Sequence, residues 1–261
     1  MKLYTNGCSY VAGHADIDYT QINNQDWPLP WHSRTTFVVE LAKHFEQDFN
    51  HAWPGSSTYR MVRTVTHFVS TIDPSEYKDY IFVLLFTHLG RTETISNEDA
   101  LPVKVDPNKI DVNYDHSYMP HEWDQHTTLS EEDNQRCLDF QKGWLLGNCR
   151  RSMYMDYLSH IQLITSLLDL KGIKYLYASI DTLDEFNDKV FEGLQKCINT
   201  ENKVEHIMRP EWWLEIAKTS DDPAAYLDRT GWTDPCGHPS RFIHSEYAKY
   251  IITELKNRNW L

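Results

Sequence analysis

YIFVLLF, residues Tyr80–Phe86, is the clearest strand in the sequence, because it is short, rich in β-forming residues and apolar throughout. Such a run is typical of a central strand buried on both faces of a parallel sheet. The flanking sequence alternates short apolar runs with segments in which apolar residues recur at helical spacing. Further strands are expected at 2–5, 48–52, 173–180 and, more weakly, 204–208, and helices at 33–47, 61–72, 152–170, 184–198 and from 240 to near the C-terminus.

Strands that alternate with helices predict an α/β protein with three α/β/α layers and a central parallel sheet, a flavodoxin-like arrangement. We expect one domain over residues 1–261, with a long insertion at about 96–150. That insertion is rich in Asp, Asn, His and Pro and lacks sustained periodicity, as lids and binding loops often do. His116, His121 and His126 within it are either solvent-exposed or, less in keeping with their spacing, metal ligands.

The composition narrows the class of protein. A formal net charge of −13 argues against a nucleic-acid backbone or an anionic membrane as the main partner. The five cysteines include no CxxC pair, which fits reduced thiols, and the N-terminal residues lack the apolar stretch of a signal peptide. We therefore expect a cytoplasmic protein with neither a metal nor an organic cofactor. The adjacent Trp212 and Trp213 suit either core packing or stacking on a sugar.

Four polar clusters fall next to the expected elements. NGCS follows the first strand at 6–9, PGSS follows the second at 54–57, THLGRTE follows the third at 87–93, and DPCGHPS precedes the last helix at 234–240. In an open parallel sheet, ligands bind outside the carboxyl ends of the strands. The four clusters are therefore expected along one edge of the sheet.

In these clusters the sequence resembles the SGNH/GDSL hydrolase family. NGCSYVAG corresponds to the family's first block with Ser9 as nucleophile, Gly55 to the glycine of the second, THLGRTE to the third, and Asp234 with His238 to the last. The resemblance implies a serine-dependent ester hydrolase, with carbohydrate O-deacetylases and acyl transferases among the options, acting on a small-molecule or glycan ester. GCSYVAG and RTE also look like SGNH-like proteins of tailed phages, which would imply the host cytoplasm.

The chemistry of a serine nucleophile explains why these residue types occur together. A serine hydroxyl needs an imidazole to take its proton, and that imidazole needs an acceptor to hold its tautomer, roles that His238 and Asp234 can fill. The oxyanion needs preorganised donors, for which the backbone N–H groups of Ser9 and Gly55 are candidates.

The sequence departs from the family pattern in three places. Cys8 stands where the family has Asp, the last pair is spaced by one extra residue, and the third block lacks its Asn. We expect Cys8 to be a buried small thiol rather than a second nucleophile.

The missing Asn normally supplies an oxyanion donor, so Thr87, His88 or Arg91 is expected to replace it. Arg91 is also a candidate fork for an anionic substrate group, and Arg63 is a weaker one. The lost Asn leaves a second hypothesis open: a binding or assembly protein that retains the scaffold without the activity.

Overall fold

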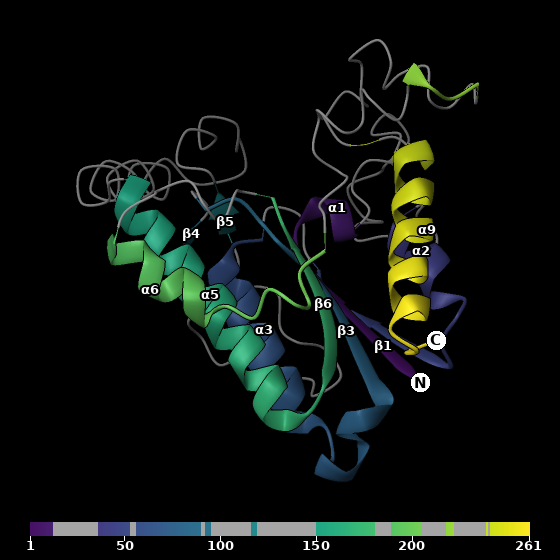
Figure 1. Ribbon diagram of the computed structural model, residues 1–261, viewed down its shortest axis with the longest axis horizontal. Helices are drawn as coiled ribbons and strands as arrows, with labels where there is room; N and C mark the ends of the chain where they lie inside the picture. The colour runs from purple at the N-terminus through teal and green to yellow at the C-terminus, as the bar shows by residue number, and fades with distance from the viewer. Residues whose placement is uncertain are drawn as a thin grey trace, which may run out of the picture.

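The computed structural model describes residues 1–12, 36–52, 56–89, 92–94, 116–118, 150–180, 189–204, 218–221, 239 and 241–261. Its central sheet has the strand order β2-β1-β3-β6, and every neighbouring pair in it is parallel (Figure 1). The four strands are β1 (Lys2–Asn6), β2 (Gln47–Asn50), β3 (Tyr80–Phe86) and β6 (Lys174–Ser179). The predicted parallel α/β fold is confirmed.

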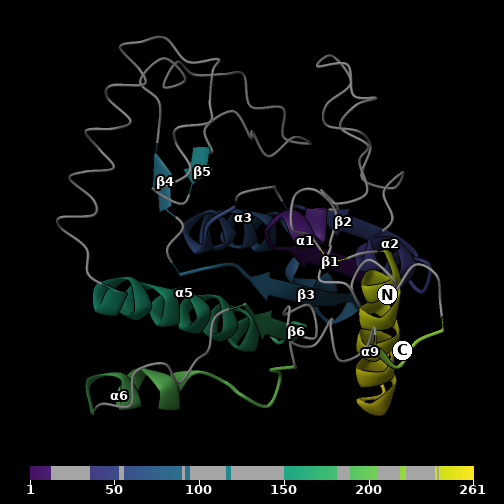
Figure 2. The same cartoon turned by 90° about the horizontal axis from the view of Figure 1, so that it is seen from above.

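Helices cover both faces of the sheet, which gives three layers (Figure 2). One face carries α3 (Thr58–Thr71), α5 (Arg150–Lys171) and α6 (Lys189–Cys197), and the other carries α2 (Phe37–Ala42) and α9 (Arg241–Asn257). Right-handed crossovers explain this division. The chain moves one way across the sheet from β1 to β2 and the opposite way from β2 to β3 and on to β6, so the connecting helices fall on opposite faces.

The shorter elements lie beside these layers. Helix α1 (Ser9–Ala12) follows β1, and a 3₁₀ helix, η2 (Pro74–Asp79), leads into β3. Strands β4 (Thr92–Thr94) and β5 (His116–Tyr118) form a separate antiparallel pair. The sequence around β5 has no periodicity, so no strand was predicted there. The rest of the predicted insertion up to residue 149 lies outside the described residues.

The hydrophobic core has two halves because successive strand residues face opposite sides of the sheet. Leu3, Ile81, Val83 and Leu85 pack toward α2 and α9, whereas Tyr4, Phe82, Leu84 and Phe86 pack toward α3 and α5. Every residue of β3 is buried, as its continuous apolar sequence predicts. The half under α3 and α5 contains many tyrosines, whose hydroxyls bring polar groups into the core.

The expected helix at 33–47 ends earlier than predicted. Helix α2 stops at Ala42, and Gln47 is already the first residue of β2. The N–H groups of His44 and Phe45 donate to the carbonyls three residues back, at 3.1 and 3.0 Å, which closes the helix with tight turns. Glu46 N–H then donates to Met1 O at 3.1 Å, so pairing beside β1 replaces the last helical turn.

The predicted end of the helix at 152–170 agrees with the structure. Helix α5 ends at Lys171, and Gly172 adopts φ +66, a left-handed conformation that glycine tolerates at the end of a helix. Beyond β6, Lys203 forms a single parallel bridge to Tyr177, next to the short strand expected at 204–208, of which 205–208 lie outside the described residues. No helix in the described ranges is long and apolar enough to cross a membrane.

Candidate active site

The turn from β1 into α1 lies where the strand order reverses, with β2 on one side of β1 and β3 on the other. Ligands of doubly wound sheets bind at such a switch point. Strand β1 ends at Asn6 and α1 begins at Ser9, with Val11 and Ala12 N–H both donating to Cys8 O at 3.0 Å. Cys8 is buried, as expected, and the description of Ser9 is limited to its backbone.

Helix α9 begins at the same edge of the sheet. Phe37 N–H, at the start of α2, donates to His244 Nδ1 at 3.4 Å, and their rings stack with centroids 6.2 Å apart. The chain runs from there through α2 to the amino edge of the sheet, where the strands begin and Glu46 N–H donates to Met1 O. At that amino edge, Lys174 of β6 lies over the ring of Trp260, 6.0 Å from its centroid, just after α9. The first turn of α9 is therefore at the carboxyl edge, near α1 (Figure 1).

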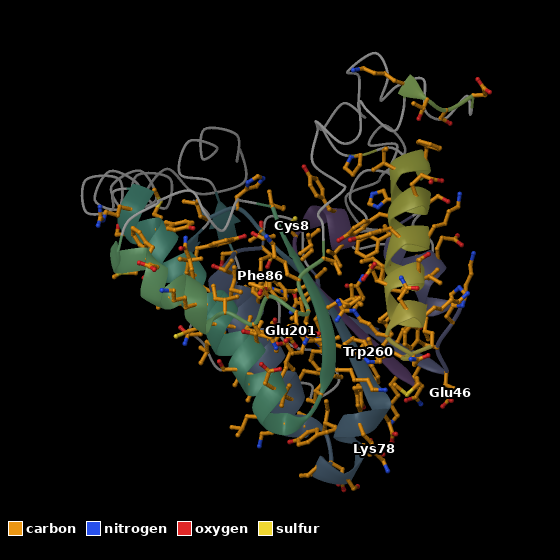
Figure 3. All side chains as sticks on the ribbon, viewed as in Figure 1. Cys8, Glu46, Lys78, Phe86, Glu201 and Trp260 are labelled. Atoms are coloured by element: carbon orange, nitrogen blue, oxygen red, sulfur yellow. The ribbon has the colours of Figure 1, made fainter. Side chains whose placement is uncertain are left out.

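The side-chain view shows the two edges of the sheet. Cys8 and Phe86 lie toward its carboxyl end, while Glu46, Lys78 and Trp260 lie toward the opposite end (Figure 3). Asp234 and His238 fall outside the described residues. Pro239, immediately after His238, is described and is buried.

A buried polar network lies directly beneath the β1–α1 turn. Asn6 Oδ1 accepts from Gly7 N–H at 2.8 Å, and Asn6 Nδ2 donates to Tyr4 OH at 2.9 Å and to Thr64 Oγ1 at 2.7 Å. Thr64 Oγ1 in turn donates to Arg60 O at 2.8 Å. Burial raises the pKa of Tyr4 well above its usual value, so its hydroxyl stays neutral.

The loop after β2 is anchored at both of its described ends. Asn50 Oδ1 accepts from Ala52 N–H at 3.0 Å, and Asn50 Nδ2 donates to Val11 O at 3.2 Å, which links β2 to α1. At the far end, Ser57 Oγ accepts from Arg60 N–H at 3.2 Å and caps α3. Gly55, the predicted oxyanion donor, lies between these anchors and outside the described residues.

A buried guanidinium and a neutral imidazole lie next to that loop. Arg60 is 3% exposed, and its Nη1 donates to His51 O at 2.9 Å. The His51 ring meets the rings of Tyr4 and Phe68 edge-on, with both centroid distances 5.2 Å. Burial, helped by the Arg60 charge, lowers the pKa of His51 to about 4, so the imidazole is neutral at pH 7.

Strand β3 extends past the end of β1. Asn6 pairs with Leu84, so β3 continues for Leu85 and Phe86 before Thr87 and His88 follow. Thr87 is fully buried and His88 is partly exposed. Arg91 lies outside the described residues, and Arg63 is exposed on α3.

The structure thus gathers the backbones of Ser9, Thr87 and His88 at one edge and leaves Gly55, Arg91, Asp234 and His238 undescribed. Sequence reasoning placed Asn6 at this edge as a turn residue and missed Arg60 and Thr64 as parts of the region. One signal was available for Arg60 and Thr64: each is a polar residue on the face of α3 that the helical pattern buries.

A metal site finds no support in the described part of the chain, where no group of three or more His, Cys, Asp or Glu could hold an ion. His116 lies in β5, where only the backbone is described. His121, His126, Trp212 and Trp213 fall outside the described residues, so their predicted alternatives are not resolved.

Solved structures similar to this chain include those of TesA, a carbohydrate esterase and an acetylxylan esterase. The TesA structure has TM-score 0.45 and 10% identity, covering 98% of this chain and 99% of that one. The carbohydrate esterase, described as having divergent catalytic and non-catalytic binding functions, has TM-score 0.45 and 11% identity, covering 100% of this chain and 70% of that one. The third, a catalytic mutant of the enzyme from Geobacillus stearothermophilus, has TM-score 0.41 and 12% identity, covering 97% and 93%.

No protein-family model matches the chain, and no curated protein sequence matches it. The structural similarities are distant, and the fold assignment rests on the sheet and helices described above.

Proposed function

We propose that the chain is a serine-dependent ester hydrolase of the SGNH/GDSL type that uses a Ser9-His238-Asp234 triad. The observation that carries the proposal is that α1 and α9 begin at the same edge of the sheet. Ser9 is the first residue of α1, and the Asp234/His238 pair directly precedes α9. The starts of α1 and α9, which are far apart in sequence, therefore lie at one edge of the sheet, and this supports the proposed pairing of Ser9 with His238.

In the proposed reaction, Ser9 Oγ attacks the ester carbonyl carbon while the His238 imidazole takes the hydroxyl proton. Asp234 accepts from the other ring nitrogen and stabilises the imidazolium. The imidazolium then returns the proton to the leaving alcohol, and an acyl group remains on Ser9. Water, or another hydroxyl in the case of acyl transfer, attacks the acyl group by the same route and frees the serine.

The negative charge on the carbonyl oxygen needs fixed donors in a site that excludes water. The backbone N–H groups of Ser9 and Gly55 are the proposed pair, with Thr87, His88 or Arg91 in place of the family's Asn. Esters of sugars are the preferred substrate class, because the SGNH/GDSL resemblance includes carbohydrate O-deacetylases and the adjacent Trp212 and Trp213 suit stacking on a sugar ring. Small or lipid esters are the alternatives.

The test combines a fluorophosphonate probe with p-nitrophenyl acetate. The wild-type protein should be labelled at Ser9 and turn over the ester, and Ser9→Ala should do neither. Ser159→Ala is the matched control, because Ser159 is exposed on α5 and, among the described residues, its Oγ bonds only within its own helix, to Met155 O at 2.8 Å. His238→Ala and Asp234→Asn should be labelled more slowly than wild type.

Two results would refute the proposal. One is a wild-type protein that shows neither labelling nor turnover, and the other is turnover that survives unchanged in Ser9→Ala. The first result would favour the second hypothesis, a binding or assembly protein built on the same scaffold, and the second would assign the turnover to a group other than Ser9.

A further inference from the structure

We infer that Asn6 is a positioning residue for Ser9. Its carboxamide holds the Gly7 peptide of the turn, and Thr64 of α3 holds the carboxamide in place. The inference rests on the proposed function, because it concerns the geometry of the same nucleophile. Asn6 is the last residue of β1, is fully buried, and precedes the Gly7-Cys8-Ser9 turn.

The first argument is the kind of residue found at this position. Tyr4, two residues earlier, packs in the hydrophobic core under α3 and α5, and an apolar side chain at Asn6 would fill the same layer. The carboxamide instead accepts from Gly7 N–H at 2.8 Å, at the peptide where the chain leaves the sheet. It thereby takes the place of the acceptor that the sheet no longer provides.

The second argument is that the carboxamide can adopt only one orientation here. Both amide hydrogens have acceptors, Tyr4 OH at 2.9 Å and Thr64 Oγ1 at 2.7 Å. A flipped amide would point its N–H at Gly7 N–H and its oxygen at two hydroxyls, and so would lose the bond to the turn. The network therefore fixes the direction in which the Gly7 peptide leaves β1.

The third argument is that the network ends on a rigid element. Thr64 Oγ1 donates to Arg60 O at 2.8 Å, so its own hydrogen is engaged and a lone pair remains for Asn6. A chain of hydrogen bonds thus runs from the α3 backbone through Thr64 and Asn6 to the Gly7 peptide. At the other end of α1, Asn50 Nδ2 holds Val11 O at 3.2 Å, so the short helix is held at both ends.

The consequence for catalysis is geometric. A displacement of a nucleophile by about 1 Å costs about a hundredfold in rate, whereas substrate binding depends on other contacts. Loss of the Asn6 link is therefore expected to lower kcat and to leave KM nearly unchanged.

The test compares Thr64→Val with Thr165→Val. Both threonines are buried, and each Oγ1 donates to the carbonyl four residues earlier in its helix, at 2.8 Å for Thr64 and 2.9 Å for Thr165. Thr64 also accepts from Asn6, whereas Thr165 lies near the end of α5 that leads into the amino edge of β6. The two variants therefore lose the same helix bond, and one of them also loses the link to the turn.

With p-nitrophenyl acetate, Thr64→Val should lower kcat by roughly tenfold or more at an unchanged KM. Thr165→Val should stay within about twofold of the wild-type kcat. Thr64→Ser, which keeps the hydroxyl, should also stay close to the wild-type kcat. Equal kcat values in Thr64→Val and Thr165→Val, in a protein that does turn over the ester, would overturn the inference.

A second readout does not need activity and separates this inference from the proposed function. Amide hydrogen exchange at Gly7, followed by NMR, should be roughly tenfold faster or more in Thr64→Val than in wild type and unchanged in Thr165→Val. If wild type neither labels nor turns over, the proposed function fails, and Gly7 exchange still decides whether the carboxamide holds the turn. Exchange at Gly7 that is the same in all three proteins would overturn the inference by itself.

Discussion

A Cβ atom on Gly7 would lie 2.8 Å from the carbonyl oxygen of Leu85, so the turn before Ser9 rests directly on the backbone of β3. The same atom would lie 2.5 Å from Val11 Cγ2 of α1. A side chain can rotate away from such a contact, but a carbonyl inside a central strand cannot. Glycine is therefore required at this position because of space.

Gly7→Ala should lower the free energy of unfolding by about 1–3 kcal/mol, as overpacking of a core does. It should also lower kcat, because the turn must move away from β3. Gly193→Ala is the matched control: Gly193 lies in α6, a Cβ there meets nothing within 4 Å, and alanine should stabilise the helix by about 0.5–1 kcal/mol. Urea unfolding of both variants measures the difference, and equal stabilities would contradict the close approach.

The proposed function requires a side-chain or backbone donor for the oxyanion, and a side-chain donor can be found by removing each candidate in turn. The variants are Thr87→Val, His88→Ala and Arg91→Met, and the one that removes an oxyanion donor should lose about 10²–10³ in kcat with little change in KM. Lys78→Met is the control, because Lys78 is exposed in η2 and lies toward the amino end of the sheet (Figure 3). If all three variants keep the wild-type kcat, the oxyanion would have to be stabilised by backbone N–H groups alone.

The sequence predicted the fold well where the signal is local. YIFVLLF matched β3 residue for residue, and the Lys171-Gly172 signal marked the end of α5. It failed where pairing elsewhere overrode local pattern: Phe45 fitted a helical face, but Glu46 pairs with Met1 and ends the helix. Strand β5 forms by pairing with β4, and its own three residues show no sequence pattern that predicts a strand.

The same distinction holds at the site. The placement of polar clusters after strands could be predicted, because parallel strands share a carboxyl edge. The bond between Asn6 and Thr64 could not, since the two residues are 58 positions apart and meet through the packing of α3 on the sheet. In the sequence, Asn6 reads as part of an Asn-Gly turn signal, and its role in the core is hidden.

A buried hydroxyl pair links α5 to the ends of β3 and β6. Tyr157 OH lies 2.5 Å from Ser179 Oγ and 3.5 Å from Phe86 O, and all three residues are buried. Tyr157→Phe should lower the free energy of unfolding by about 1–3 kcal/mol, because buried polar groups lose a partner.

Tyr59→Phe is the comparison, since Tyr59 is exposed and its hydroxyl donates to Asp156 at 2.9 Å. It should cost about 0.5 kcal/mol or less. Thermal or urea unfolding of the two variants makes the comparison, and equal losses would show that the Tyr157 bond contributes no more than a surface contact.

The buried imidazole of His51 is expected to make the folded protein less stable in mild acid. Its Nδ1 is buried and has no hydrogen-bond partner among the described residues, and the ring is held between Tyr4 and Phe68 close to the Arg60 guanidinium. Burial first, and then the Arg60 charge, lower its pKa from 6.5 to about 4. Between those two pH values the unfolded chain binds a proton that the folded protein excludes.

The free energy of unfolding should therefore be highest above pH 6.5 and fall as the pH drops toward 4, with His51 accounting for about 2 kcal/mol by pH 5. Burial also lowers the pKa of His160, so the acid loss is shared, and the His51 part is isolated by substitution.

His51→Leu should lose less stability between pH 7.5 and pH 5 than wild type does, by about 2 kcal/mol in urea unfolding, because leucine has no proton to bind. Thr66→Val serves as the control, since Thr66 is exposed on α3 and has no ionisable group, and it should follow the wild-type pH dependence. If His51→Leu kept the full wild-type loss, the His51 ring would have to be protonated in the folded protein already at pH 5. The cationic Arg60 side chain, with its bond to His51 O at 2.9 Å, argues against a second buried charge at that point.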